Sequence, residues 1–198
     1  MAELLVPAYV HWSDEATWER IVAAAPSIVV INPMNGPDPS QTEHYARILK
    51  LLAEANVRTR VLGYVWCDYF GRRGRAIRAD ASAYSATLPI DGIFWDGIPT
   101  TDDRTTRRRL RALHDATAFS VYNCGAPMAM RWEAMLPGAV FVTFEGAADD
   151  YDPDHVVVGG GACHLVHSAA ADWVVPVAPD LGYRCVTTGK LPNPWCVF

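Results

Sequence analysis

Ile28-Val29-Val30-Ile31 is a run of four apolar residues with no polar residue between them. A strand with one wet face would alternate apolar and polar residues, so this run predicts a strand that is buried on both faces. Residues with helical spacing lie on either side of it, and they are Trp18, Ile21, Val22 and Ala25 before it and Tyr45, Ile48, Leu49 and Leu52 after it. A buried strand between two amphipathic helices indicates a parallel sheet covered by helices.

The same alternation continues to the end of the chain. Strands are expected at residues 4–10, 28–31, 60–66, 92–95, 118–122, 139–144, 163–167 and 183–187. Helical patterns separate most of them, including a first helix capped by Ser13, a loop and then a helix within 77–88, and helices at 105–116 and 128–135. Eight strands joined by right-handed crossovers predict an α/β fold, a compact (β/α)8 TIM-type barrel that forms one domain over residues 1–198.

An open, doubly wound sheet is the alternative architecture. Such a sheet usually carries a glycine-rich phosphate loop after its first strand, and the sequence has none there. The glycines at 159–161 come late in the chain, before a predicted strand, and are interpreted as a flexible turn.

Composition and charge exclude several classes of protein. Of the 198 residues, 51% are hydrophobic and 20% are charged, which is typical of a globular chain. The net charge of −5 argues against a nucleic-acid partner, and no apolar run approaches the roughly 18 residues of a membrane span. The first residues lack a basic signal-peptide region, so the sequence as it stands predicts a cytoplasmic protein, or a secreted one if a leader has been removed.

An arginine cluster at residues 104–111 follows Asp102 and Asp103. Acids at the start of a helix and bases towards its end suit the helix dipole, so a solvated helix is the main interpretation. An anion or partner site is the alternative.

Cysteines and histidines show no metal-binding spacing, so no metal and no cofactor are expected. The five cysteines form no C-x-x-C pair and are interpreted as buried free thiols. One disulfide among Cys163, Cys185 and Cys196 is the alternative for an exported protein. His164 and His167 are three apart on a predicted strand, which places them on opposite faces, and His167 is expected at the barrel mouth.

Polar residues end the predicted strands, which is where barrel enzymes place their active sites. The series is His11, Asn32, Asp68, Asp96, Asn123, Glu145, His167 and Thr188. Helix capping and contact with solvent would also put polar residues there. The series carries more weight as a set, because it places three carboxylates at the same end of the barrel.

Two of these acids, Asp96 and Glu145, each follow an apolar strand that ends in an aromatic residue. Partial burial would raise a carboxyl pKa, and a neighbouring charge would separate the pKa values of a pair. Glycosidic cleavage needs such a pair, one to protonate the leaving oxygen and one to attack the sugar or activate water. Capping or ion pairing is the structural alternative, and a Cys124 nucleophile with His167 as base is a further one.

Aromatic residues gather at the same predicted strand ends. They are Tyr9, Trp12, Tyr64, Trp66, Tyr69, Trp95 and Tyr122. Flat rings with polar edges suit the faces of sugars as well as packing in a core. The segment from Trp66 to Tyr69 precedes a glycine at a strand end, which favours the wall of a site.

The ordered motifs resemble the spherulin-4 family, also described as spherulation-specific family 4. They are Val6-Pro7-Ala8-Tyr9, Ile31-Asn32-Pro33 with Gly36-Pro37, Val61-Leu62-Gly63-Tyr64-Val65 with Asp68-Tyr69, Asp91-Gly92-Ile93-Phe94-Trp95-Asp96, Tyr122-Asn123-Cys124-Gly125, Phe144-Glu145, His167, and the segment from Thr187 to Trp195. The match covers nearly the whole chain, and the joint order of the motifs is more specific than any one of them.

The resemblance implies a (β/α)8 barrel glycoside hydrolase. It would act within α-1,4-linked galactosamine or N-acetylgalactosamine polysaccharides, with retention of configuration. Asp96 would be the nucleophile and Glu145 the general acid/base, or the reverse. The residues expected to bind the oligo- or polysaccharide substrate are Tyr9, His11, Asn32, Tyr64, Asp68, Tyr69, Trp95, Asn123 and His167.

The chain departs from the family pattern directly after Asp96. Active members carry a glutamate there, whereas this chain has Gly97. A non-catalytic carbohydrate-binding barrel is therefore an alternative function. A barrel enzyme repurposed for bacterial small-molecule metabolism is another, because an intracellular protein would rarely meet a secreted polysaccharide. The sequence leaves the oligomeric state open.

Overall fold

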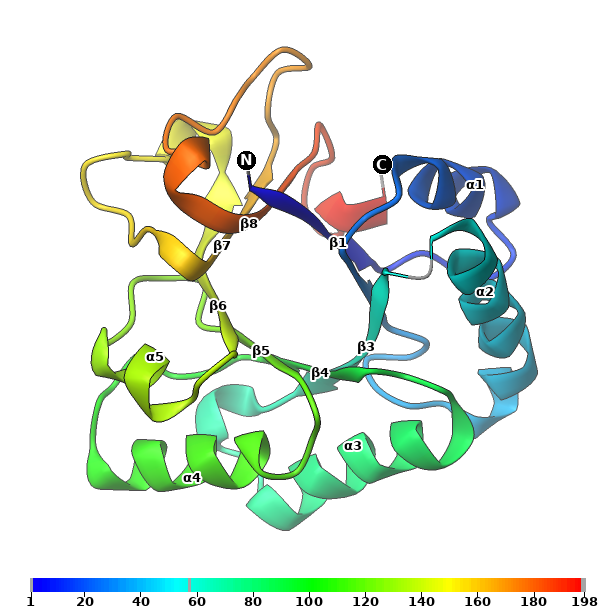
Figure 1. Cartoon of the computed structure of the whole chain (residues 1–198), viewed down its shortest axis with the longest axis horizontal. Helices are drawn as coiled ribbons and strands as arrows, with labels where there is room; N and C mark the ends of the chain where they lie inside the picture. The colour runs from blue at the N-terminus through cyan, green and yellow to red at the C-terminus, as the bar shows by residue number, and fades with distance from the viewer. Residues whose placement is uncertain (1, 57, 197–198) are drawn as a thin grey trace.

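The computed structural model describes residues 2–56 and 58–196, and its eight parallel strands close into one barrel in chain order (Figure 1). The predicted TIM-type barrel is therefore confirmed. The strands are β1 Glu3–Ala8, β2 Ile28–Ile31, β3 Arg60–Trp66, β4 Gly92–Asp96, β5 Ser120–Asn123, β6 Val140–Ala147, β7 Gly159–His167 and β8 Leu181–Val186.

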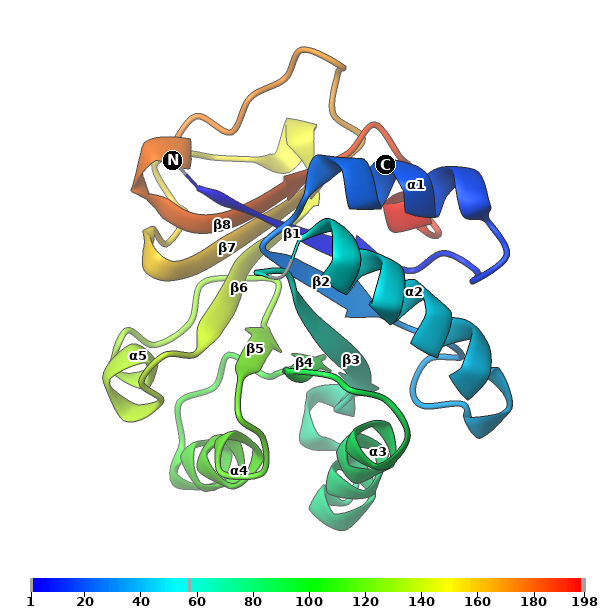
Figure 2. The same ribbon diagram turned by 45° about the vertical axis from the view of Figure 1, so that its right-hand side comes forward.

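The helices lie outside the barrel and are unevenly distributed around it. They are α1 Glu15–Ala24, α2 Thr42–Ala55, α3 Gly74–Thr87, α4 Arg104–His114 and α5 Arg131–Met135. Between β6 and β8 the helical elements among the described residues are two single 3₁₀ turns, Ala148–Asp150 and Ala178–Asp180. Figure 2 shows α1 to α4 around the first strands and irregular segments beside β7 and β8.

Alternation along the strands builds two apolar layers. Side chains such as Leu5, Val30 and Phe94 fill the barrel interior. The neighbouring residues Val29 and Ile93 point the other way and pack with the inner faces of the helices. Because both faces of each strand are covered, strand runs of four and five residues can be wholly apolar.

Three local expectations are wrong. Asp14, not Ser13, caps α1 and accepts a hydrogen bond from the Thr17 backbone N–H at 3.1 Å. Helix α3 already begins at Gly74, because its first turn is polar and arginine-rich and carries no apolar stripe to mark it. The glycines at 159–161 belong to β7 and are not a free turn, since the chain there pairs with β8 at Gly159 and Leu181.

The described cysteine thiols Cys67, Cys124, Cys163 and Cys185 are free, as expected. Cys163 and Cys185 lie in the packed barrel interior, where burial raises the pKa of the Cys185 thiol to about 12. The alternative disulfide between these two is therefore wrong. The side chain of Cys196 lies outside what the structure describes.

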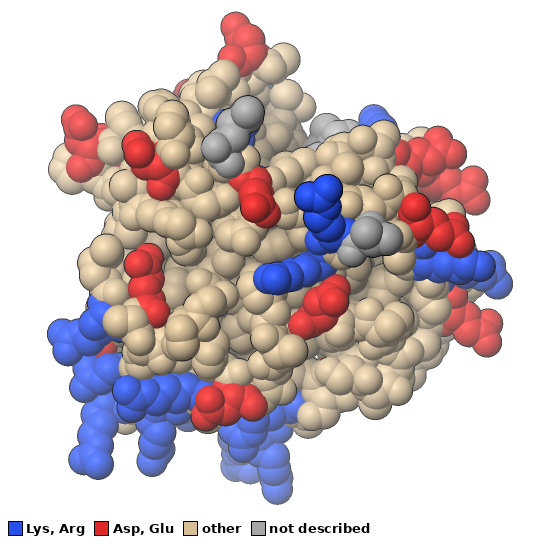
Figure 3. Space-filling view, in the orientation of Figure 1, with Lys and Arg blue, Asp and Glu red and all other residues tan. Residues whose placement is uncertain are grey.

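The arginine cluster lies on α4, and its first turn is arranged as expected. Asp103 caps the helix through the Thr106 N–H at 2.7 Å, and Asp102 forms ion pairs with Arg107 and Arg131. Figure 3 shows Lys and Arg side chains gathered along the edge that α3 and α4 form in Figure 1. Within the described residues, no helix has the length and apolarity to cross a membrane.

Gly63 on β3 provides a test of the packing between strands and helices. A Cβ added there would lie 2.6 Å from the ring of Tyr84 on α3, whereas a Cβ at Gly160 on β7 would meet nothing within 4 Å. We expect Gly63→Ala to lower the free energy of unfolding by about 1–3 kcal/mol through overpacking. Urea denaturation measures this, with Gly160→Ala as the matched control. Equal midpoints for the two variants would contradict the packing described.

Candidate active site

Three adjacent strands place three polar side chains at the carboxyl-terminal mouth of the barrel. Asp96 is the last residue of β4, Asn123 is the last residue of β5, and Glu145 lies near the end of β6. Asp96 and Asn123 follow inward-pointing Phe94 and Val121 by two residues, so simple alternation directs both into the barrel.

Glu145 reaches the interior only because β6 contains a bulge. The side chains of Val140 and Val142 point inward, so strict alternation would turn Glu145 outward. The pairing with β7 shifts between Val142 and Phe144, which leaves Thr143 as an extra residue. An extra residue reverses the direction of every later side chain, and Glu145 therefore points into the mouth.

The Asn123 amide connects the two carboxyl groups. Its Nδ2 donates to Asp96 Oδ1 at 2.7 Å and to Glu145 Oε2 at 2.5 Å. These two oxygens therefore lie no more than 5.2 Å apart, which is the sum of the two hydrogen-bond lengths. The amide oxygen accepts the Gly125 backbone N–H at 3.0 Å, which fixes the side chain with both of its N–H groups on the acids.

The two carboxyl groups differ in their other donors. Asp96 also accepts the Tyr64 hydroxyl at 2.6 Å and the Gly97 backbone N–H at 2.9 Å. Glu145 also accepts only the Trp195 indole N–H, at 3.3 Å, among the described partners. The anionic form of Asp96 therefore has the stronger hydrogen-bond support.

Burial raises the pKa of both carboxyl groups above the ordinary range. For Asp96 the hydrogen bonds from Tyr64, Gly97 and Asn123 oppose that rise. For Glu145 the negative charge of Asp96 adds to the rise, while Asn123 and Trp195 oppose it. The charge of Asp96 raises the pKa of Glu145, whereas the pKa of Asp96 has no such contribution from Glu145. Glu145 is therefore the acid suited to hold the proton.

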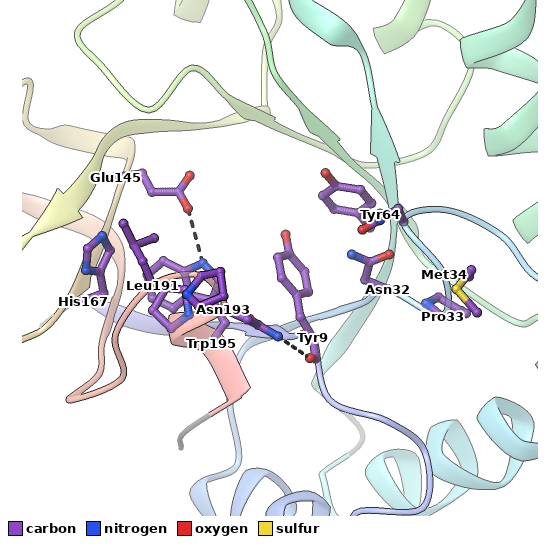
Figure 4. Close-up of a pocket in the computed structure, with 13 residues that line it drawn as sticks. Tyr9, Asn32, Pro33, Met34, Tyr64, Glu145, His167, Leu191, Asn193 and Trp195 are labelled. Atoms are coloured by element: carbon purple, nitrogen blue, oxygen red, sulfur yellow. Dashed lines mark hydrogen bonds between the residues drawn. The ribbon is translucent and has the colours of Figure 1, made fainter.

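A cavity of about 630 Å³ opens beside these acids. Figure 4 shows Tyr9 and Tyr64 on one side of it and Glu145, His167 and Trp195 on the other. Burial, with the nearby acids, raises the pKa of Tyr9 and Tyr64, so both hydroxyls keep their protons and can donate. The remaining wall consists of Asn32, Pro33, Met34, Asn35 and the segment from Leu191 to Pro194.

The structure brings most of the predicted site residues together. Those that line the cavity or hold its acids are Tyr9, Asn32, Tyr64, Asp96, Asn123, Glu145 and His167. His164 lies on the other face of β7, where it contacts Tyr151 and the Val157 carbonyl.

Four predicted substrate-binding residues lie elsewhere. Trp95 is fully buried and directed outward, because it precedes an inward residue on β4, and its indole N–H reaches Ser120 Oγ. His11 is exposed and bonds to Ser13. Asp68 and Tyr69 are exposed in the left-handed turn after β3, where the chain has already left the barrel.

Trp195 is the site residue that sequence reasoning missed. It comes from the single turn Pro194–Cys196, and its indole contacts Glu145 as well as the His167 ring at 6.2 Å between centroids. The Asn193 side-chain amide ties the same segment to the Tyr9 carbonyl at 3.1 Å. No strand or helix pattern marks this segment; its local signal in the sequence is two prolines and a tryptophan.

Gly97 adopts a left-handed conformation with φ +65°. A Cβ at this position would lie 2.4 Å from Cζ3 of Trp66. The ring of Trp66 thus occupies the space into which a side chain at position 97 would project. A glutamate at position 97 is incompatible with this arrangement of Trp66.

The described residues contain no group of three His, Cys, Asp or Glu side chains that could hold a metal ion. The groups at the mouth are therefore a carboxyl pair, an amide and aromatic hydroxyls. Such a set can transfer protons and stabilise positive charge through the two acids.

Comparisons with known proteins agree with a barrel of this class. The sequence profile of Spherulin4, spherulation-specific family 4, matches residues 3–175. The crystal structure of Aspergillus clavatus Sph3 in complex with GalNAc has a TM-score of 0.81 and 24% identity, over 100% of this chain and 92% of that one. A search among curated proteins found no match.

Two further structures share the fold at lower similarity. CpGH84B has a TM-score of 0.61 and 9% identity, over 93% of this chain and 44% of that one. Proteus mirabilis N-acetylneuraminate lyase has a TM-score of 0.52 and 10% identity, over 95% of this chain and 70% of that one. At these identities the likenesses show the fold alone.

The fold and the site define a (β/α)8 barrel with a partly buried carboxyl pair at its mouth. Because the family profile covers most of the residues, the chain belongs to spherulation-specific family 4.

The shared amide provides a test that needs no substrate. We expect Asn123→Ala to raise the pKa of both Asp96 and Glu145 further, because each carboxylate loses a donor and their mutual repulsion stays. Carboxyl ¹³C NMR titration measures both values. Asn32→Ala is the matched control, since the Asn32 side chain accepts the Gly36 N–H and, among the described contacts, is not hydrogen-bonded to either acid. Unchanged values in Asn123→Ala would show that the amide does not couple the pair.

Proposed function

We propose that the protein is a glycoside hydrolase that cleaves within α-1,4-linked polysaccharides containing galactosamine or N-acetylgalactosamine. The observation that carries the proposal is the partly buried pair of Asp96 and Glu145, whose amide-linked oxygens are at most 5.2 Å apart. Retaining glycosidases place their two carboxyl groups about 5–5.5 Å apart, and inverting ones about 6.5–9.5 Å. The spacing supports a retaining mechanism.

In the first step Glu145 acts as the acid and Asp96 as the nucleophile. The proton of the Glu145 carboxyl passes to the glycosidic oxygen while a carboxylate oxygen of Asp96 bonds to the anomeric carbon. The C–O bond to the leaving sugar breaks, and its electron pair stays with the protonated oxygen. The donors on Asp96 favour its anionic state before the attack.

In the second step Glu145, now a carboxylate, removes a proton from water. The resulting hydroxide attacks the anomeric carbon, and the ester bond to Asp96 breaks. Glu145 regains its proton and Asp96 its negative charge, so both acids return to their starting states. The hydroxyls of Tyr9 and Tyr64 and the ring of His167 line the cavity where the sugar would lie.

The choice of sugar rests on the family and on the structural neighbour. The chain belongs to spherulation-specific family 4, and Sph3 was crystallised with GalNAc. The aromatic side chains Tyr9, Tyr64 and Trp195 around the cavity suit the faces of a pyranose ring.

A non-catalytic sugar-binding barrel is the competing function, and the glycine at position 97 favours it. This alternative predicts saturable binding of oligosaccharide with no product after long incubation. The hydrolase proposal requires product from the wild-type chain, so one assay separates the two.

Neutralising either acid tests the catalytic assignment. We expect Asp96→Asn and Glu145→Gln each to lower kcat by at least about 10²–10⁴-fold, since each removes a proton donor or nucleophile. The measurement is release of shorter oligosaccharides from an α-1,4-linked N-acetylgalactosamine oligomer, followed by mass spectrometry. Asp150→Asn, an exposed acid just after β6, is the control and should retain full activity. Full activity in Glu145→Gln would overturn the assignment.

The raised pKa of Glu145 also predicts how stability depends on pH. The folded state binds this proton more tightly than the unfolded chain, so the contribution of Glu145 to the wild-type free energy of unfolding decreases as pH rises from the ordinary carboxyl pKa through the raised one. Glu145→Gln lacks this contribution. Its stability relative to wild type should therefore increase with pH across that window in urea denaturation. A constant difference would contradict the burial of an ionisable Glu145.

A further inference from the structure

A second cavity, of about 520 Å³, adjoins the first. It is lined by Asn35, Tyr64, Trp66, Arg72 and Asp80, and we call it the Trp66 pocket. Asn35 and Tyr64 line both cavities, and the Tyr64 hydroxyl is bonded to Asp96. A ligand that reaches over Tyr64 from the carboxyl pair would therefore enter the Trp66 pocket directly.

The polar groups of the Trp66 pocket are held in place before any ligand binds. The Arg72 guanidinium donates to the Trp66 carbonyl at 2.5 Å and to Asp80 Oδ2 at 2.7 Å. Arginine has five N–H donors, and the described contacts use two of them. The side chains of Arg72 and Asp80 are 30% and 31% exposed, so the unused donors and carboxylate lone pairs face an accessible space.

The Trp66 ring is also fixed. Tyr69 packs edge-on against the Trp66 ring, with ring centroids 5.6 Å apart. The Trp66 ring itself fills the space beside Gly97. A side chain at position 97 would push the ring away. The glycine directly after Asp96 therefore keeps an aromatic surface next to the carboxyl pair.

The charge of the pocket limits which ligand it can take. The positive charge of Arg72 is paired with Asp80, so the pocket offers no uncompensated charge to an anion or a cation. The pocket presents the Trp66 ring, the Asn35 amide, and the hydrogen-bond donors of Arg72 beside the acceptors of Asp80. A neutral ring with several hydroxyl groups matches these features, since its C–H face packs on the indole and its hydroxyls bond to the ion pair.

We infer that the Trp66 pocket binds a second neutral pyranose unit of the same polysaccharide chain, next to the unit at the carboxyl pair. This inference rests on the proposed function, because it takes the first cavity to hold one sugar of that chain. Preformed contacts at the second unit would make affinity depend on chain length. Arg72 and Trp66 thereby determine the preference for longer substrates.

The test compares ligands of different length in a chain that cannot cleave them. Calorimetry on the Glu145→Gln protein measures the Kd of N-acetylgalactosamine and of its α-1,4-linked tetrasaccharide. We expect Arg72→Met in this background to weaken tetrasaccharide binding about tenfold and monosaccharide binding less than twofold. Trp66→Ala should act in the same direction. Arg75→Met removes an exposed arginine from the same region outside the pocket and should change neither value.

The outcomes separate the inference from the proposed function. If the wild-type protein releases no product from the tetrasaccharide and the Glu145→Gln protein binds neither ligand, the proposed function fails and the inference fails with it. If the wild type cleaves the tetrasaccharide but Arg72→Met alters both ligands equally or alters neither, the inference alone is overturned. Circular dichroism of each variant confirms that it is folded.

Discussion

Two partly buried acidic side chains, Asp96 and Glu145, have carboxyl oxygens held within 5.2 Å of one another by a single amide group. Like charges at this distance repel strongly in a poorly solvated site, so Asp96 and Glu145 cannot both ionise freely. The amide of Asn123 lowers this cost because it gives each acid one N–H donor. The chemistry proposed for the barrel depends on this arrangement, since it favours the proton on Glu145 and the anion on Asp96.

Most of the barrel could be predicted from the sequence, because buried parallel strands appear as short apolar runs. The apolar run Ile28–Ile31 has the same bounds as strand β2. The polar residues that follow such runs indicate the carboxyl-terminal mouth of the barrel. The orientation of Glu145 could not be derived from its strand, because the bulge at Thr143 has no signature in a pattern of period two. Trp95 and Asp96 are neighbours on β4, so alternation places the Trp95 side chain on the face opposite the mouth.

The rest of the site depends on contacts between distant parts of the chain. Trp195 lies 50 positions after Glu145 in the sequence, yet its indole N–H is bonded to that carboxyl group. The segment that carries it has no regular pattern, so only the closed structure shows that it forms a wall. The role of Gly97 also depends on a contact that the sequence does not show, because the Trp66 ring fills the space beside it. Such pairings involve side-chain volume in three dimensions, which residue spacing does not encode.

The stereochemistry of the first product tests the two-carboxylate account most directly. Proton NMR can follow the wild-type protein with an α-1,4-linked N-acetylgalactosamine oligosaccharide and identify the anomer released before mutarotation. The separation of Asp96 and Glu145 predicts that the α-anomer appears first, through two successive displacements. A β-anomer as the first product, or no product at all, would contradict the assignment of this pair as nucleophile and acid.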